Sequence, residues 1–331
     1  MSSATSRPVM YGDGSRWLLL HADCLALLPE LPENSVEAIV TEPPYGIGFA
    51  GEAWDGGSLT DAETFQRWTT SWATEALRVL KPGGWLAAFG NPRTTHRLVA
   101  GVEDAGFEVR DQLLWLYANG VPKSHHRADG LGSALKPAYE PVLLARKPIA
   151  GTLDASLAAH GTGALQIDAT RVPRREGGQG FWPANVALTH GPHCRQGRCQ
   201  PDCPVALVDA EPRPGREISR LFYTPKASRG EREAGCEALA LREVPIYPRG
   251  GGSMRLVRNT HPTVKPLALM RWITRLLCPP GGTVLDPFAG SGSTGAACAL
   301  EGRRFIGIER DERYVPVACA RIEHWSGEAG K

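Results

Sequence analysis

Long apolar runs are absent from this 331-residue sequence. No window approaches the roughly 18 consecutive apolar residues that a membrane-spanning helix needs, so we expect no membrane segment. Residues 1–14 lack the apolar centre of a signal peptide, and we expect them to form a flexible tail. These absences argue against a transporter, a receptor or a secreted protein. We therefore expect a cytoplasmic protein with no membrane partner.

The composition is that of an ordinary globular protein. Apolar residues make up 42% and charged residues 22%, which permits a core of good size. Eight cysteines in a reducing compartment favour thiols or metal ligands over disulfides. We find no internal repeat.

The net charge of +2 is unevenly distributed. Residues 171–258 contain 15 basic and 9 acidic residues, whereas the rest of the chain contains 22 basic and 26 acidic residues. A basic segment on a mildly acidic body indicates a surface for a polyanion. A solvated, arginine-rich linker is the alternative interpretation.

Strand-like and helix-like segments alternate in the first half of the chain and again near its end. This order predicts an α/β fold, a Rossmann-like, mostly parallel sheet with helices on both faces. Between them, residues 148–260 are rich in Gly, Pro and Arg and show little periodicity. We expect 15–147 and 261–325 to be the two halves of one domain, 148–260 an irregular insertion, and 1–14 and 326–331 tails.

A glycine-rich turn follows the predicted strand at 282–286. Its sequence is D-P-F-A-G-S-G-S-T-G, and Gly290, Gly292 and Gly295 match the G-x-G-x-x-G pattern of dinucleotide-binding folds. Only 36 residues follow Gly295, and an acid, Asp286, precedes the glycines, so a dinucleotide fold is disfavoured. The turn resembles instead the S-adenosylmethionine turn of methyltransferases. A tight strand–helix turn without a ligand is the bland alternative.

The chemistry of the segment suits that cofactor. Glycines let the backbone approach the amino-acid part of the cofactor. Glu309, at the end of the next predicted strand, can accept hydrogen bonds from both ribose hydroxyls. The cofactor-binding candidates in this region are Asp286, Phe288, Gly290, Ser291, Gly292 and Glu309.

The catalytic candidate is T-E-P-P-Y-G at residues 41–46, after the strand-like run V-E-A-I-V. Glu42, Pro43, Pro44 and Tyr45 place a carboxylate, a stiff backbone and a flat ring at one strand end. Further blocks follow in order along the chain. They are D-C-L-A-L-L-P-E-L-P-E-N-S-V from residue 23, P-P-Y-G-I-G-F from 43, K-P-G-G from 81, G-F-E-V-R-D from 106, A-L-K-P-A-Y-E-P-V-L-L-A-R-K-P from 134, H-P-T-V-K-P from 261 and D-P-F-A-G-S-G from 286.

These blocks resemble the amino-group DNA methyltransferases, which modify adenine N6 or cytosine N4, of the class in which the catalytic motif precedes the cofactor motif. The similarity is to phage and prophage-type adenine methylases and covers most of the chain. Protein-glutamine and ribosomal methyltransferases carry a tetrapeptide similar to the P-P-Y motif, but their cofactor turn comes first. The resemblance implies S-adenosyl-L-methionine as methyl donor, double-stranded DNA as substrate, and DNA methylation of the restriction–modification kind.

The implied reaction is direct methyl transfer to an exocyclic base amine. The side chain at position 42 and the Pro43 carbonyl can accept the two amine N–H groups and stabilise the positive charge that develops. Tyr45 offers a stacking face for a base rotated out of the duplex. We expect hydrogen bonding in the transition state at position 42, rather than strong general-base action.

Glu42 departs from the family, which usually has Asp, Asn or Ser there. Glutamate adds one C–C bond, about 1.5 Å. Three outcomes stay open: an active enzyme with a shifted backbone, a slow enzyme, or a DNA-binding protein without turnover. An acid at this position favours adenine over cytosine, and N4-cytosine methylation is the alternative.

Three further sites follow from the resemblance or from composition. Asp23 and Cys24 are expected near the cofactor's adenine, although Asp23 can also cap a helix. Lys265 is expected near the methionine end of the cofactor, with a salt bridge as the alternative. The loop 46–57 is either a lid over the target base or an ordinary surface loop.

A cluster of His and Cys residues lies inside the basic segment. His190, Cys194, Cys199 and Cys203, with His193 as an alternative ligand, could hold a structural zinc ion. Their spacing is not one of the common zinc patterns, and reduced thiols are the alternative. We expect the surrounding arginines and Lys226 to contact DNA. A homodimer is expected only by analogy with the class.

Overall fold

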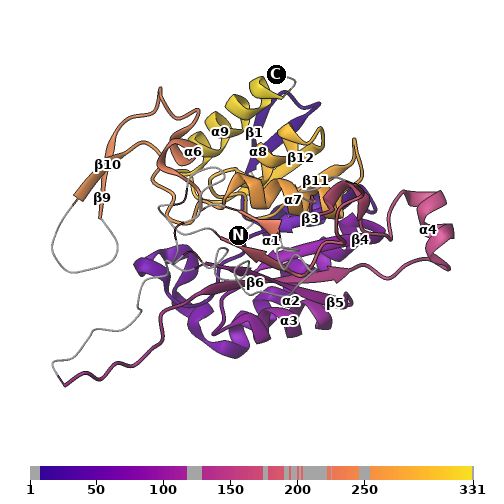
Figure 1. Ribbon diagram of the computed structural model, residues 1–331, viewed down its shortest axis with the longest axis horizontal. Helices are drawn as coiled ribbons and strands as arrows, with labels where there is room; N and C mark the ends of the chain where they lie inside the picture. Colours follow the sequence, from indigo (N-terminus) through magenta and orange to yellow (C-terminus); the bar gives the residue numbers. More distant parts are fainter. Residues whose placement is uncertain are drawn as a thin grey trace, which may run out of the picture.

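The computed structural model describes residues 8–117, 129–173, 178–189, 194, 200, 203, 222–224, 226–245 and 254–329. Within these residues ten strands form one sheet (Figure 1). Their spatial order is β1 (Val9–Gly12), β2 (Trp17–His21), β12 (Arg304–Glu309), β11 (Thr283–Asp286), β3 (Val36–Thr41), β4 (Leu80–Phe89), β6 (Tyr139–Arg146), β5 (Glu108–Leu116), β7 (Val186–Leu188) and β8 (Phe222–Tyr223).

Most neighbouring strands in the sheet are parallel. The run β2–β12–β11–β3–β4 is parallel throughout, and β5, β7 and β8 are parallel to one another. The antiparallel strands are β1, at one edge, and β6, between β4 and β5. The sequence prediction of a mostly parallel α/β sheet is therefore confirmed.

Helices cover both faces of this sheet, and each face carries its own core (Figure 1). On one face lie α1 (Cys24–Leu27), α2 (Ala62–Val79) and α3 (Thr95–Asp104); on the other lie α7 (Leu267–Leu277), α8 (Ser293–Leu300) and α9 (Val315–Glu328). The alternation of a strand explains the division, since Ala38 and Val40 face the second group and Ile39 faces the first. Among the described residues, no helix is long and apolar enough to cross a membrane.

Smaller elements extend from this body. They are η1 (Leu28–Glu30), η2 (Phe49–Gly51), η3 (Ala53–Asp55), η4 (Gly57–Thr60), α4 (Leu153–His160), η5 (Asp168–Thr170), α6 (Arg229–Glu233), β9 (Arg242–Pro245) and β10 (Met254–Val257). The antiparallel β9–β10 hairpin and α4 project on opposite sides of the molecule (Figure 1).

Some segments differ from the sequence prediction. Residues 9–12, expected in the tail, form β1, because the Asp13 carboxylate accepts hydrogen bonds from Ser15 N (2.9 Å) and Arg16 N and turns the chain back onto β2. The predicted insertion contributes β7 and β8 to the main sheet, and α9 continues to Glu328. The K-P-G-G block ends α2 as expected but lies inside β4.

The topology brings the predicted site residues to one edge. Asp286 and Glu309 end β11 and β12, while Glu42 directly follows β3. Asp23 lies two residues beyond β2. Because these four strands are parallel and adjacent, their carboxyl ends meet at the same side of the sheet, where open α/β sheets bind ligands.

Candidate active site

A cavity of about 500 Å³ lies at these strand ends. It joins the two regions that sequence analysis assigned to catalysis and to cofactor binding. The predicted residues that line it are Asp23, Cys24, Glu42, Pro43, Pro44, Tyr45, Lys265, Asp286, Phe288, Gly290, Ser291 and Glu309. Gly292 lies next to them as the N-cap of α8, with φ of 72°.

Glu42 forms a buried ion pair with Lys265 on the floor of the cavity. The Tyr45 hydroxyl donates to Glu42 Oε1 at 3.1 Å. Burial raises the pKa of Glu42 to about 7, although Lys265 and the Tyr45 hydroxyl act in the opposite direction. Glu42 is therefore held in one position by two partners, and Lys265 makes the salt bridge that was the alternative to a cofactor contact.

Glu140 on β6 completes this cluster and was not assigned from the sequence. Its Oε2 atom lies 3.0 Å from Lys265 Nζ and accepts a hydrogen bond from the Tyr45 hydroxyl, also at 3.0 Å. Burial lowers the pKa of the Lys265 ammonium, but the two carboxylates outweigh that effect and raise it overall. The signal in the sequence was an acid at the start of the apolar run P-V-L-L-A-R, inside a block already singled out.

The backbone of Tyr45 is fixed from two directions. Its carbonyl accepts a hydrogen bond from Thr94 Oγ1 at 2.7 Å, and its N–H donates to the Asp55 carboxylate. The ring therefore has a defined place beside Glu42. Its hydroxyl is committed to two carboxylates, which, together with burial, raises the pKa of Tyr45 well above 10.

Asp286 links the catalytic strand to the cofactor turn. Its Oδ1 atom accepts from Thr41 Oγ1 at 2.6 Å and from Phe288 N at 3.1 Å, while Oδ2 accepts from Thr294 Oγ1 at 2.7 Å. Burial raises the pKa of Asp286 to about 6 despite these donors. Because Thr41 directly precedes Glu42, this contact sets the position of the catalytic segment relative to the glycine turn.

The glycine turn has a backbone that other residues do not adopt easily. Gly290 has φ of 51°, and a Cβ atom there would lie 2.7 Å from His261 Nε2. Its N–H donates to Glu309 Oε2 at 2.7 Å, and Asp311 N donates to Oε1 at 2.6 Å. Burial raises the pKa of Glu309 to about 7. Each Glu309 oxygen keeps a second acceptor position for a ligand hydroxyl.

The opposite wall of this end of the cavity is largely apolar. The Phe288 ring packs edge-on against Trp72, with centroids 5.5 Å apart, and lies at the same distance from Trp68. Asp23 caps α1 by accepting from Leu25 N at 2.9 Å, so it makes the cap contact while also lining the cavity. Cys24 is buried beside it, and burial raises the pKa of its thiol to about 12.

The loop 46–57 folds around Asp55. The buried Asp55 carboxylate accepts from Gly46 N at 2.8 Å and from Phe49 N at 2.7 Å. Trp54 stacks on His261 with ring centroids 6.4 Å apart, and Glu52 pairs with Arg313 at 2.9 Å. The loop thus contacts the residues beside the glycine turn, and it closes the cofactor end of the cavity.

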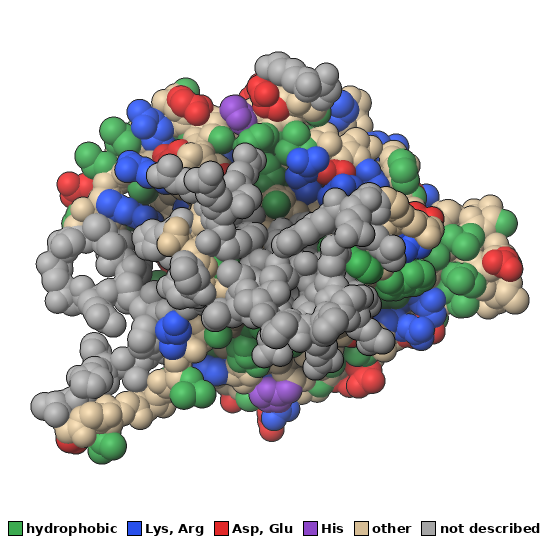
Figure 2. Space-filling model, viewed as in Figure 1, with side chains coloured by type: hydrophobic (Ala, Val, Ile, Leu, Met, Phe, Trp, Pro, Cys, Tyr) green, Lys and Arg blue, Asp and Glu red, His purple; other side chains and the backbone are tan. Residues whose placement is uncertain are grey.

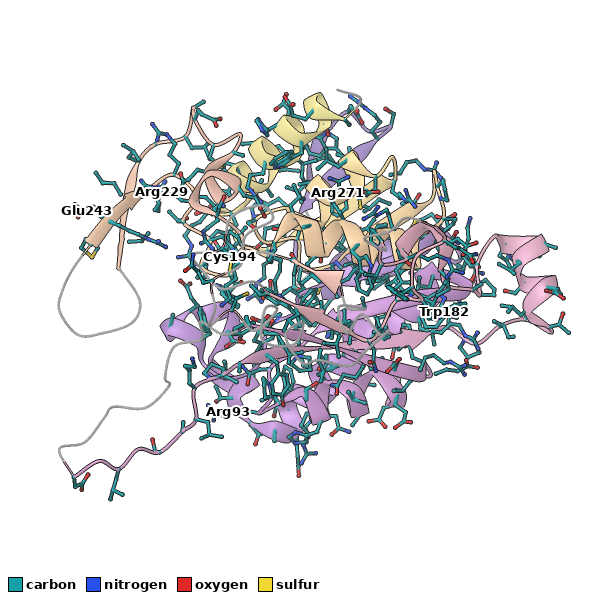
Figure 3. The ribbon with its side chains drawn as sticks, viewed as in Figure 1. Arg93, Trp182, Cys194, Arg229, Glu243 and Arg271 are labelled. Carbon is teal, nitrogen blue, oxygen red and sulfur yellow. The ribbon has the colours of Figure 1, made fainter. Side chains whose placement is uncertain are left out.

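The predicted DNA-contacting region is only partly described. Figure 2 shows basic and acidic side chains interspersed over the described part of one face. Arg229 lies near the β9–β10 hairpin, whereas Trp182, over which Arg171 packs, lies toward α4 (Figure 3). Lys226 does not face solvent alone: its Nζ lies 3.7 Å from the centre of the Tyr117 ring, beside the cavity.

The zinc prediction involves residues that the structure mostly leaves out. His190, His193 and Cys199 lie outside the described residues. Cys194 and Cys203 are described as free thiols, and Gln200 N donates to Cys194 Sγ at 3.5 Å. No group of three or more potential metal ligands occurs among the residues described. The zinc site stays a prediction.

Solved structures with this fold define the class. The chain aligns with the cytosine-N4-specific PvuII DNA methyltransferase at a TM-score of 0.56 and 18% identity, over 93% of this chain and 86% of that one. It also aligns with a DNA modification methylase of Thermus thermophilus, TTHA0409, solved with S-adenosyl-L-methionine, at a TM-score of 0.51 and 21% identity, over 94% and 96% of the two chains. The fold is that of the DNA methyltransferases.

The sequence comparison gives the family. A family model described as DNA methylase, for N6 and N4 methyltransferases, matches residues 36–320, and the chain belongs to this family. The DNA adenine methyltransferase YhdJ of Escherichia coli K12 is 28% identical over 329 residues, which cover 97% of this chain and 88% of the relative. The resemblance inferred from the ordered blocks is thereby confirmed.

Proposed function

We propose that this protein transfers a methyl group from S-adenosyl-L-methionine to the N6 amine of a flipped adenine in double-stranded DNA. One observation carries the proposal: Glu42 and the glycine turn, which the sequence assigns to different tasks, line the same cavity. The acceptor for the target amine and the candidate cofactor site are therefore within reach of each other, as direct transfer requires.

The residues of the turn fit the cofactor. The Gly290 backbone occupies space that any side chain would need, so a ligand can lie close against it. Glu309 retains acceptor positions for the ribose hydroxyls, and Phe288 with Cys24 supplies an apolar surface for the adenine. The cofactor supplies the methyl group as an electrophile on sulfur. Every other element of the reaction falls to side chains and backbone of this chain.

Glu42 and Pro43 would hold the target amine. An exocyclic amine is a poor nucleophile because its lone pair is delocalised into the ring. Hydrogen bonds from its two N–H groups to a carboxylate and a carbonyl favour a tetrahedral nitrogen and stabilise the developing positive charge. Lys265 supports this role because it keeps the buried Glu42 in its ionised, acceptor-only form.

Two features support adenine as the target base. An acid occupies position 42, and the E. coli relative is named as an adenine methyltransferase. The structural match to a cytosine-N4 enzyme makes cytosine the second candidate. We assign DNA recognition to residues 148–260, which contribute the strands β7 and β8 beside β5.

Incubation with unmethylated DNA and methyl-labelled cofactor, followed by digestion to nucleosides, tests the proposal. We expect label on N6-methyladenine. Label on N4-methylcytosine would replace the adenine assignment with the cytosine one. Binding of DNA without any incorporated label would show that the glutamate at position 42 has left a DNA-binding protein without turnover.

A further inference from the structure

Glu140 is a buried carboxylate that the proposed reaction does not yet use. It enters the cavity from β6, the antiparallel strand between β4 and β5, and its side chain is only 19% exposed. Its Oε2 atom contacts Lys265 Nζ and the Tyr45 hydroxyl, both at 3.0 Å. Lys265, whose side chain is 5% exposed, therefore lies between two carboxylates, Glu140 and Glu42.

Charged and titratable groups face this cluster from several elements. Glu42 faces Lys265, Glu140 and Tyr45. Glu140 also faces Tyr117 on the strand beside it and Lys226 from the insertion, and His261 lies near Lys265. The pKa of His261 falls to about 3 through burial, so this ring stays neutral. In the buried interior, each change of charge on Glu42 must be balanced by these neighbours.

We propose that Glu42 takes up the proton that leaves the methylated amine, and that Glu140 is the positioning residue that holds the Lys265 ammonium while Glu42 is neutral. This inference rests on the proposed function. A single carboxylate paired with Lys265 would be a poor proton acceptor, because neutralising it would strand a buried ammonium. The second carboxylate removes that penalty.

The step is balanced in atoms and charge. The bond between the methyl carbon and the cofactor sulfur breaks as a bond forms between that carbon and the amine nitrogen. The nitrogen then carries a positive charge and one proton more than the product. That N–H bond breaks, an O–H bond forms on Glu42, and the ammonium of Lys265 keeps Glu140 as its counter-ion. Glu42 returns the proton to solvent after the product leaves.

The pH dependence of single-turnover methylation tests this assignment. In the wild type we expect the rate to rise with pH through about 7, since Glu42 must start ionised. Glu140→Gln removes a negative charge that raises the pKa of Glu42, so the acid limb should move to lower pH. The plateau rate should fall by about tenfold or more, because Glu42 is then a weaker base.

Matched variants separate this role from a structural one. Glu140→Asp keeps the charge and should restore the acid limb and part of the rate. Glu108→Gln breaks another glutamate ion pair, to Arg146 at the other end of the same strand pair and outside the cavity, and should change neither limb nor plateau. If Glu140→Gln does not fold, Lys265→Gln decides the question, since loss of the ammonium should move the limb to higher pH.

A rate that falls equally at every pH in Glu140→Gln, with an unmoved acid limb, overturns the inference while leaving the methyltransferase assignment intact. An unmoved limb in Lys265→Gln does the same. A wild-type protein that methylates no base overturns the proposed function itself and the inference with it.

Discussion

Shortening Glu42 by one carbon shows whether the site is built around glutamate. The substitution Glu42→Asp restores a residue common in the family but withdraws the carboxylate by about 1.5 Å. The Tyr45 hydroxyl donates to Glu42 at 3.1 Å and Lys265 contacts the same oxygen, so both contacts would be lost or stretched beyond hydrogen-bond range. A misplacement of about 1 Å at a reacting centre costs on the order of a hundredfold in rate. We therefore expect a fall of that size, or about 2.7 kcal/mol in the barrier.

Single-turnover methylation at saturating cofactor, with pH above 7, measures this effect. Glu37→Asp is the matched control, because Glu37 is also a buried glutamate on β3 but pairs with Lys81 outside the cavity. This control should lose stability yet keep the rate of its folded fraction. A gain in rate in Glu42→Asp would refute the reasoning and would mean that the glutamate handicaps the site.

Three further predictions concern the cofactor turn, the buried acids and the metal. Gly290→Ala should abolish the thermal stabilisation given by S-adenosylhomocysteine, because its Cβ would lie 2.7 Å from His261, whereas Gly281→Ala, also at positive φ but with nothing within 4 Å, should keep it; equal shifts would contradict the cradle. The pKa of Glu309 is raised from 4.5 to about 7, so its contribution to stability is present below about 4.5 and lost as pH rises through 7. Wild type should lose on the order of 3 kcal/mol relative to Glu309→Gln across this window in urea unfolding, and a constant difference would refute the burial argument. Metal analysis after gel filtration should give about one zinc per chain for the cluster at 190–203, and a ratio near zero removes that site.

The local signals in the sequence located much of the fold. The helix at Ser293–Leu300 and the strand at Arg304–Glu309 have the predicted bounds, because a glycine turn, an apolar run and a terminal acid mark them without help from the rest of the chain. The meeting of Glu42 with the glycine turn also followed from the order of strands and helices, since parallel strands share a carboxyl edge.

The contacts that depend on non-sequential strand order could not be predicted. Glu140 reaches Lys265 only because β6 inserts between β4 and β5, and no local pattern specifies that position. The pairing of β7 with β5 is hidden in the same way, since β7 has only three residues in a segment rich in turns. Asp55 looked like one polar residue of a loop, and its role emerged only from the backbone N–H groups that converge on it.

Mass spectrometry of DNA treated with the protein and a cofactor bearing a deuterated methyl group tests the central claim most directly. We predict deuterated N6-methyladenine with the wild type and a large loss of it with Glu42→Gln, although that variant should still bind S-adenosylhomocysteine. The appearance of deuterated N4-methylcytosine instead, or undiminished N6-methyladenine with Glu42→Gln, would contradict the account of Glu42 as the acceptor for an adenine amine.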